Sequence, residues 1–182
     1  MNYSEKMLKL LPGQVVSHSQ LREDGFSKKE IAAMSASLRL FPTPFKGMYY
    51  IPTPEEREGW FIEKPVRVLS LALEFFLEGR RFYYSCETAE EALGIKWRPC
   101  GRVHVVNEKL SGRVDLKERI RRNEGKGTYR AKKIARLLSF YGNEIIFHRT
   151  RKIGGSEVEH TPYGSFASRM QIGRDKKRFM GE

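Results

Sequence analysis

The hydrophobic pattern of the first fifty residues predicts two helices near the N-terminus of the chain. The clearer helix begins after Ser27, a favourable N-cap residue, and carries apolar residues at three- and four-residue intervals. These apolar residues share one face and are expected to be buried: Ile31, Met34 and Leu38. A shorter helix over 17–23, capped by Ser17 or Ser19, precedes it, and Gly25 separates the two helices.

Two short apolar runs after the second helix are typical of strands. They cover 38–41 and 48–51, and the proline-containing segment 42–47 connects them as a turn. Two helices around a glycine turn, followed by a hairpin, predict a winged helix-turn-helix domain over 1–52, which an amphipathic helix over 3–11 would brace. Such a unit commonly reads DNA, although short helix pairs with a hairpin also serve as dimerisation or protein-docking modules.

The rest of the chain mixes predicted helices and strands and is expected to form an α/β domain over 60–182. Its longest predicted helix spans 63–78, where apolar residues cover one broad face. The other predicted elements are strands at 80–85, 102–107, 113–116 and 144–149, and helices at 87–93, 117–124, 129–141 and 166–178. The tail from residue 153 is expected to be less regular. The predicted fold class is therefore α+β.

The segment 52–59 is the expected linker between the two domains, because it combines prolines, a charge cluster and a glycine. A proline followed by carboxylates is also a favourable helix start, so a short helix is the alternative. The acidity of this segment contrasts with its basic flanks. We therefore expect it to point away from a bound nucleic acid.

The charge of the chain narrows the choice of partner. The chain has 34 Lys and Arg against 22 Asp and Glu, a net charge of +12, and such a field attracts polyanions. The alternative is that this charge serves solubility alone.

No apolar run approaches the roughly 20 residues of a membrane span, and the N-terminus lacks the apolar core of a signal peptide. A cytoplasmic location and no membrane partner are expected.

Candidate DNA-binding residues fall into two groups. The first group lies on the free face of the helix after Ser27 and at the hairpin tip, and consists of Ser27, Lys28, Lys29, Ser35, Arg39 and Lys46. The second group belongs to a basic stretch over 117–136 and includes Arg121, Arg122, Lys126, Arg130, Lys132 and Lys133. The second group would bind phosphates without sequence selectivity. The alternative is that these cations cover an apolar helix face and stay solvated.

Motifs for catalysis or cofactor binding are missing from the sequence. The four histidines lack HxxxH or HxE spacing, so no metal site is predicted. The segment 85–87 lacks the GxSxG pattern of a nucleophile elbow, and 125–128 lacks the spacing of a phosphate-binding loop. Cys86 and Cys100 form no CxxC pair and are expected to be structural thiols, with a disulfide left open. We therefore predict no enzyme activity and no cofactor.

Several segments together resemble a known family. They are the helix pair with Leu21 and Gly25, the hairpin residues 47–49, and the segment 81–94, RFYYSCETAEEALG. This pattern resembles AbiEi-type proteins, the antitoxin and transcriptional-regulator components of AbiE (type IV) toxin–antitoxin systems. Two features depart from the family pattern: the turn at 42–44 replaces an Arg/Gly-rich approach to the wing, and the basic stretch 117–136 is more elaborate.

The resemblance implies a DNA-binding N-domain that represses its own operon. It also implies a C-domain tied in some members to antitoxin activity, and a neighbouring nucleotidyltransferase-like toxin. Two alternatives remain open, a protein-binding antitoxin that does not read DNA and an RNA-binding accessory protein. Double-stranded DNA is the expected partner, and the toxin and a second copy of the chain in a homodimer are further candidates.

Overall fold

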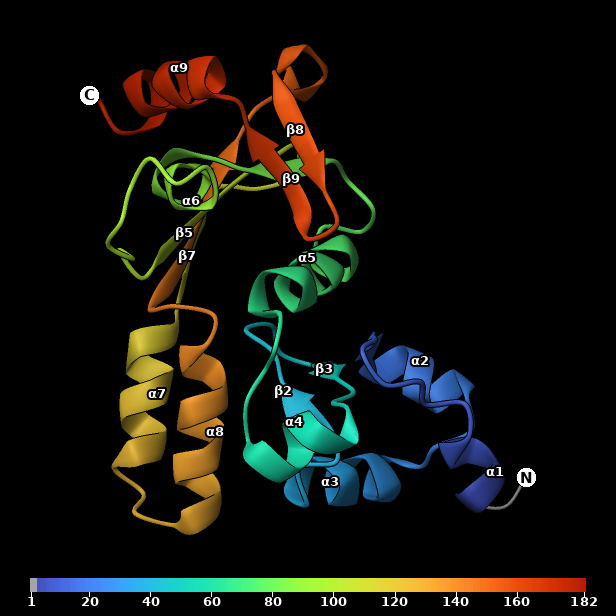
Figure 1. Cartoon of the computed structure of the whole chain (residues 1–182). Helices are drawn as coiled ribbons and strands as arrows, with labels where there is room; N and C mark the ends of the chain where they lie inside the picture. The colour runs from blue at the N-terminus through green and yellow to red at the C-terminus, as the bar shows by residue number, and fades with distance from the viewer. Residues whose placement is uncertain (1–2) are drawn as a thin grey trace.

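The computed structural model describes residues 3–182, which form nine α-helices, one short 3-10 helix and two β-sheets (Figure 1). The fold class is therefore α+β, as the sequence predicts. The smaller sheet lies in the N-terminal third of the chain, and the larger one is built by the rest. No helix among the described residues has both the length and the apolar character needed to cross a bilayer.

The N-terminal elements surround the smaller, three-stranded sheet. In chain order they are α1 (Tyr3–Met7), β1 (Val15–Ser17), α2 (His18–Glu23), α3 (Lys28–Ala36), β2 (Phe41–Pro42) and β3 (Met48–Tyr50). The strands are antiparallel in the order β1-β3-β2. Ser17 caps α2 by accepting a hydrogen bond from Gln20 N (3.1 Å), and Ser27 caps α3, so the prediction of Ser27 is confirmed and Ser17 rather than Ser19 is the first cap.

Two predicted boundaries in this region are wrong. α1 ends at Met7 rather than at residue 11, and Leu8 is 82% exposed, so the apolar stripe expected along 3–11 does not form. Leu38 is not a strand residue, since its φ of 53° places it in the left-handed turn that follows α3. It is buried nonetheless, which explains why its pattern suggested both a helix face and a strand.

The C-terminal elements build the larger, six-stranded sheet, with strand order β6-β7-β5-β4-β9-β8. β5 pairs parallel with β7 and β4 pairs parallel with β9, whereas the other neighbours are antiparallel. The elements are α4 (Pro54–Gly59), α5 (Pro65–Phe76), β4 (Phe82–Tyr84), α6 (Cys86–Ala92), β5 (Arg102–Asn107), β6 (Gly112–Asp115), α7 (Leu116–Glu124), α8 (Tyr129–Ser139), β7 (Glu144–Arg149), η1 (Ile153–Gly155), β8 (Val158–Thr161), β9 (Gly164–Ala167) and α9 (Arg169–Phe179). The tail is more regular than expected, because it adds the strands β8 and β9, and the helix predicted at 166–178 forms as α9.

Two hydrophobic cores meet at the three-stranded sheet. Val16 and Ile51 pack with α2 and α3 in the smaller core, whereas their neighbours Val15 and Tyr50 belong to the larger core with α5 and the six-stranded sheet. Successive strand residues point to opposite faces, so the smaller sheet is buried on both sides. The larger core therefore includes residues on both sides of the expected linker. The division into domains at 1–52 and 60–182 stays a prediction.

The expected linker is largely the helix α4, which corresponds to the helical alternative. Thr53 caps it, and the Glu56 carboxylate is buried where the two parts of the chain meet. This carboxylate accepts hydrogen bonds from the Tyr50 hydroxyl (2.6 Å), Thr53 N (3.0 Å) and Glu63 N (2.9 Å). Because a buried charge needs such partners, Glu56 fixes the segment in place.

Candidate nucleic-acid interface

Helix α3 begins with a reciprocal cap that fixes its first turn. The Ser27 hydroxyl accepts a hydrogen bond from Glu30 N (3.1 Å), and the Glu30 carboxylate accepts one from Ser27 N. Lys6 of α1 approaches the same carboxylate at 3.1 Å. Hydrogen bonds from the Ser27 backbone and side chain, followed by Lys6, lower the pKa of Glu30 to about 2. The Glu30 carboxylate therefore already occupies the backbone N–H of Ser27.

The outer face of α3 is exposed and carries small side chains. Lys28 and Lys29 are exposed on the first turn, and the residues beyond them that are also exposed are Ala32, Ala33 and Ala36. Ile31 and Met34 are buried on the opposite face, as predicted. A helix with small side chains can approach a surface closely, and this face has two cations at its start, which makes it the candidate for contact with a groove.

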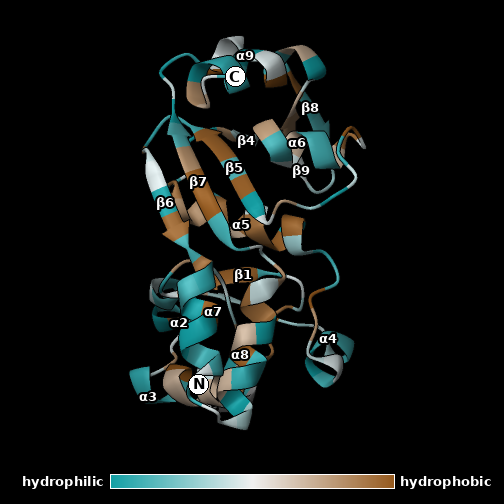
Figure 2. Cartoon of the chain, turned by 90° about the vertical axis from the view of Figure 1, so that its left-hand side faces the viewer, coloured by the Kyte–Doolittle hydropathy of each residue, from teal (hydrophilic) through white to brown (hydrophobic). Residues whose placement is uncertain are grey.

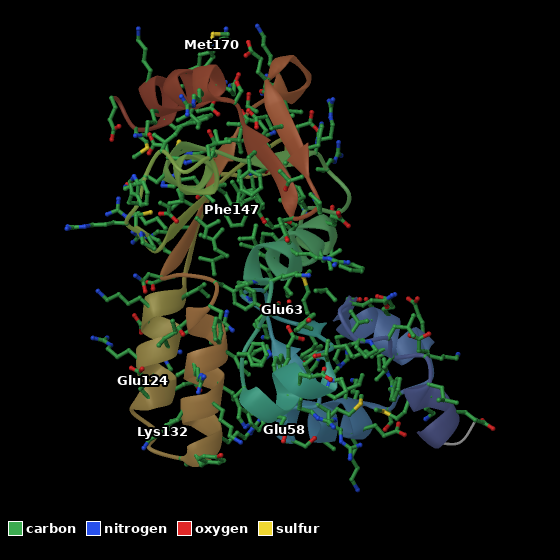
Figure 3. All side chains as sticks on the ribbon, viewed as in Figure 1. Glu58, Glu63, Glu124, Lys132, Phe147 and Met170 are labelled. Carbon is green, nitrogen blue, oxygen red and sulfur yellow. The ribbon has the colours of Figure 1, made fainter. Side chains whose placement is uncertain are left out.

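The basic stretch forms an antiparallel helical hairpin of α7 and α8, which lies beside the N-terminal elements in Figure 1. Arg121, Lys126 and Lys132 are exposed on it. Figure 3 shows Lys132 together with Glu124 on the half of the hairpin away from the sheet. Arg122 is also exposed, but pairs with Glu118 at 2.9 Å. The apolar side of α8 is covered and most of its cations face solvent, so phosphate binding by this stretch stays a prediction.

The hairpin touches α3 and the segment after α4. Arg130 donates to the backbone oxygen of Ser35 at 3.5 Å, a long contact that places the start of α8 next to the last turn of α3. The Lys133 ammonium lies 3.2 Å from the ring centroid of Trp60 and 4.0 Å from that of Tyr129. Lys133 thus holds the hairpin against the N-terminal part rather than extending into solvent.

Lys46 and Arg39 lie apart from this junction. Lys46 is exposed, but the turn that carries it is docked: Phe45 stacks on Phe76 of α5 with centroids 4.2 Å apart, and Arg119 of α7 donates to Pro44 O. The tip of the β2–β3 hairpin therefore lies at the end of the small sheet that faces α5. Arg39 is exposed and lines a cavity of about 160 Å³ with Met7, Leu10, Pro12, Met34, Ile51, Pro52, Pro54 and Arg57.

The acidic helix α4 and helix α3 lie on the same side of the α7–α8 hairpin in Figure 1, and Figure 2 views them from behind that hairpin. Met34 of α3 and Pro54 and Arg57 of α4 line the same small cavity. Glu55 and Glu58 of α4 are exposed, and Figure 3 labels Glu58 on this helix. The expectation that this acidic segment points away from a bound nucleic acid stays a prediction.

Sequence reasoning missed two features. The contact between Arg130 and Ser35 joins residues from distant elements, and no local pattern could reveal it. The structure also gathers Cys86, His104 and His148, whose thiol and ring nitrogen atoms all lie within 4.8 Å of one another. Their spacing along the chain contains no metal-binding motif, because the parallel pairing of β5 with β7 is what brings the histidines together.

Comparison with models of known protein families, with curated protein sequences and with solved structures found no match.

Proposed function

We propose that this chain is a sequence-specific DNA-binding protein that regulates transcription. The observation that carries the proposal is the junction of the exposed face of α3 with the basic α7–α8 hairpin at Ser35 and Arg130. A helix face of small side chains that begins with Lys28 and Lys29 supplies the means to approach base edges, and the adjoining cations supply phosphate affinity. The net charge of +12 supports a polyanionic partner.

The N-terminal unit is proposed to be a winged helix-turn-helix with α3 as its reading helix. The element order, the strand order β1-β3-β2 and the glycine turn between α2 and α3 support this assignment. In such units the N-terminal residues of the second helix contact base edges, which gives Lys28 and Lys29 that role. The Ser27 hydroxyl and Ser35 would contact the backbone or bases nearby.

The α7–α8 hairpin is proposed to take over the phosphate contacts that a free wing would make. The tip of the β2–β3 turn is engaged with α5 and α7 through Phe45 and Pro44, which leaves Lys46 as its exposed side chain. Arg121, Lys126, Arg130 and Lys132 lie on the hairpin instead. Arg39 contributes at the side of α3 away from it.

The resemblance to AbiEi-type proteins makes repression of the chain's own operon the form of regulation we propose. A protein-binding antitoxin and an RNA-binding accessory protein are the competing functions. A stoichiometric complex with a nucleotidyltransferase-like toxin that survives high salt would favour the first. Stronger binding to single-stranded or structured RNA than to any duplex DNA would favour the second.

Selection of bound sequences from a random DNA duplex library tests the proposal. We expect enrichment of a defined site, which the protein binds more tightly than random duplex. Replacing Lys28 and Lys29 with Ala should weaken binding to the selected site more than binding to random duplex, because these side chains are expected to bind base edges as well as phosphates. Circular dichroism of the variant should be unchanged, since both side chains are exposed.

The double substitution Lys152→Ala with Lys177→Ala is the matched control. It also lowers the net charge from +12 to +10 (12 − 2), and both lysines are exposed but lie in the C-terminal tail, away from α3. We expect it to change specific binding far less. Selection without enrichment, or equal losses in the two double variants, would refute the assignment of α3 as the reading helix.

A further inference from the structure

Three residues with metal-binding side chains meet between the six-stranded sheet and its covering helices. His104 of β5 pairs with Ile146 in register, and Val106 pairs with His148 of β7, so the histidines occupy diagonal positions on one face of the sheet. α6 and α9 cover this face (Figure 1), and Cys86 is the first residue of α6. The two histidine rings lie nearly parallel, at 7°, and His104 Nδ1 is 3.0 Å from His148 Nε2.

The three side chains are largely removed from solvent. Cys86 is fully buried, His104 is 2% exposed and His148 is partly exposed. Two neutral imidazoles each offer a lone-pair nitrogen, the form that binds metal ions.

A carboxylate next to His104 determines where its proton lies. Glu87 Oε2 is 3.5 Å from His104 Nε2, and within the described part of the chain neither buried atom has a hydrogen-bond partner. Lys96 Nζ lies 2.7 Å from the other carboxylate oxygen of Glu87. This ion-paired carboxylate beside Nε2 favours the proton on that nitrogen, which leaves the lone pair on Nδ1, facing His148. Metal-binding histidines are commonly oriented by a carboxylate in this way.

The backbone at Cys86 is unusual as well. Its φ is 50°, a left-handed conformation that non-glycine residues seldom adopt. The other non-glycine residues with positive φ among those described are Leu38, Trp60 and Glu78, and each ends a helix, where this conformation is common. Cys86 instead starts one. The surrounding packing therefore holds its thiol against the two histidines at a cost in backbone strain.

We propose that Cys86, His104 and His148 bind a zinc ion. One thiolate and two imidazole nitrogens are a donor set that zinc prefers, and three protein ligands leave the fourth coordination position for water. In a tetrahedral site with bonds of 2.0–2.3 Å, ligand atoms lie roughly 3.3–3.6 Å apart. The two nitrogens, 3.0 Å apart, are close to this spacing, and the thiol sulfur lies within 4.8 Å of both.

Binding requires two proton movements. The Cys86 thiol loses its proton to solvent as the Zn–S bond forms, and a proton on His148 Nε2 moves to Nδ1 by exchange with solvent, which its partial exposure permits. Asp175 is not a ligand, because it already accepts hydrogen bonds from the Tyr83 hydroxyl, the Ser85 hydroxyl and Gln171 Nε2. The ion would tie the start of α6 to β5 and β7 and would stabilise the C-terminal part of the fold.

Titration of the purified, chelator-treated full chain with Zn²⁺ alone, and with Co²⁺ as a spectroscopic probe, tests the site. We expect one ion per chain, a rise in melting temperature with Zn²⁺, and a thiolate-to-cobalt charge-transfer band. Cys86→Ser should abolish the band. Glu87→Gln should lower zinc affinity about 10–100-fold, the usual effect of removing a partner of a metal-bound histidine.

The double variant Cys100→Ser with His160→Gln is the matched control, since it removes one thiol and one imidazole outside the cluster. We expect it to bind zinc as the unmodified chain does. His148→Gln complements Cys86→Ser, because a partly exposed side chain can be replaced with less effect on folding. The proposal is overturned if the unmodified chain takes up no zinc, or if folded His148→Gln and the control double variant bind the metal equally well.

Discussion

At the scale of single residues, the start of α3 shows what a short pattern can specify. The S-x-x-E sequence from Ser27 to Glu30 forms the capping box that this spacing favours. The third member of the cluster, Lys6, comes from α1, and nothing in the local sequence points to it. The helix proposed to read DNA is thus positioned partly by a charge pair with a distant element.

This cluster leads to a prediction about acid stability. The pKa of Glu30 is about 2 in the folded chain, below its ordinary value of 4.5, so the ionised carboxylate stabilises the fold. That contribution is fully present above pH 4.5 and is lost as the pH falls from 4.5 towards 2. Glu30→Gln keeps an acceptor for Ser27 N but removes the charge. We expect the unmodified chain to be more stable than this variant at about pH 7, and the difference to shrink in acid.

Urea denaturation of both chains at several pH values measures that difference. Glu55→Gln is a suitable control, because the pKa of Glu55 is also lowered, by hydrogen bonds at the start of α4, but it has no ion pair with Lys6. Lys6→Met removes the ion pair with Glu30, so it should reproduce part of the stability loss that Glu30→Gln causes. It should reproduce none of the stability change that Glu55→Gln causes. A stability difference that stays constant from neutral pH into strong acid would show that the charge of Glu30 contributes nothing.

At the scale of elements, prediction succeeded where periodicity alone decides the structure. The helices α3 and α8 and the strands β5 and β7 lie where apolar spacing placed them, and α7 forms over the charge-rich stretch expected to be helical. It failed at 3–11 and in the tail, because Leu8 stays exposed although its spacing fits a buried stripe, and β8 is short and mostly exposed. The turn at 42–47 was predicted as a turn, but the burial of Phe45 depends on α5, which no local pattern encodes.

The docking of this turn gives the second prediction. Phe45 is 3% exposed and contacts Phe76 and Phe147. Figure 3 labels Phe147, which lies between the sheet and α5. Phe45→Ala should lower the free energy of unfolding by about 3–5 kcal/mol, the usual cost of removing a buried aromatic ring. Phe75→Ala removes the same ring from an α5 position that is 40% exposed, and should cost much less. Equal losses in thermal or urea denaturation would mean that the turn is not anchored.

At the scale of the whole molecule, the candidate site was only partly predictable. The exposure of Lys28 and Lys29 follows from helical periodicity, which buries Ile31 and Met34 and so turns the lysines outward. The proximity of the hairpin to α3 depends on tertiary contacts, namely Arg130 with Ser35 and Lys133 with Trp60. Charge counting gave the excess of cations, whereas only the fold places the basic hairpin against Trp60, the residue that ends α4.

The last prediction concerns how this charge contributes to DNA affinity. Arg121, Lys126 and Lys132 are exposed, unlike Lys133, which lies against Trp60. Replacing all three with Ala should weaken binding to every duplex by a similar factor. It should also flatten the dependence of log K on log salt by about 1 for each phosphate that the variant no longer neutralises. Sequence preference should persist, because phosphate contacts carry no sequence information.

The triple variant Lys152→Ala, Arg169→Ala and Lys177→Ala removes the same charges from exposed positions in the tail, and its salt dependence should match that of the unmodified chain. If both triple variants flatten the slope equally, the hairpin acts only through net charge and makes no direct contact with phosphate.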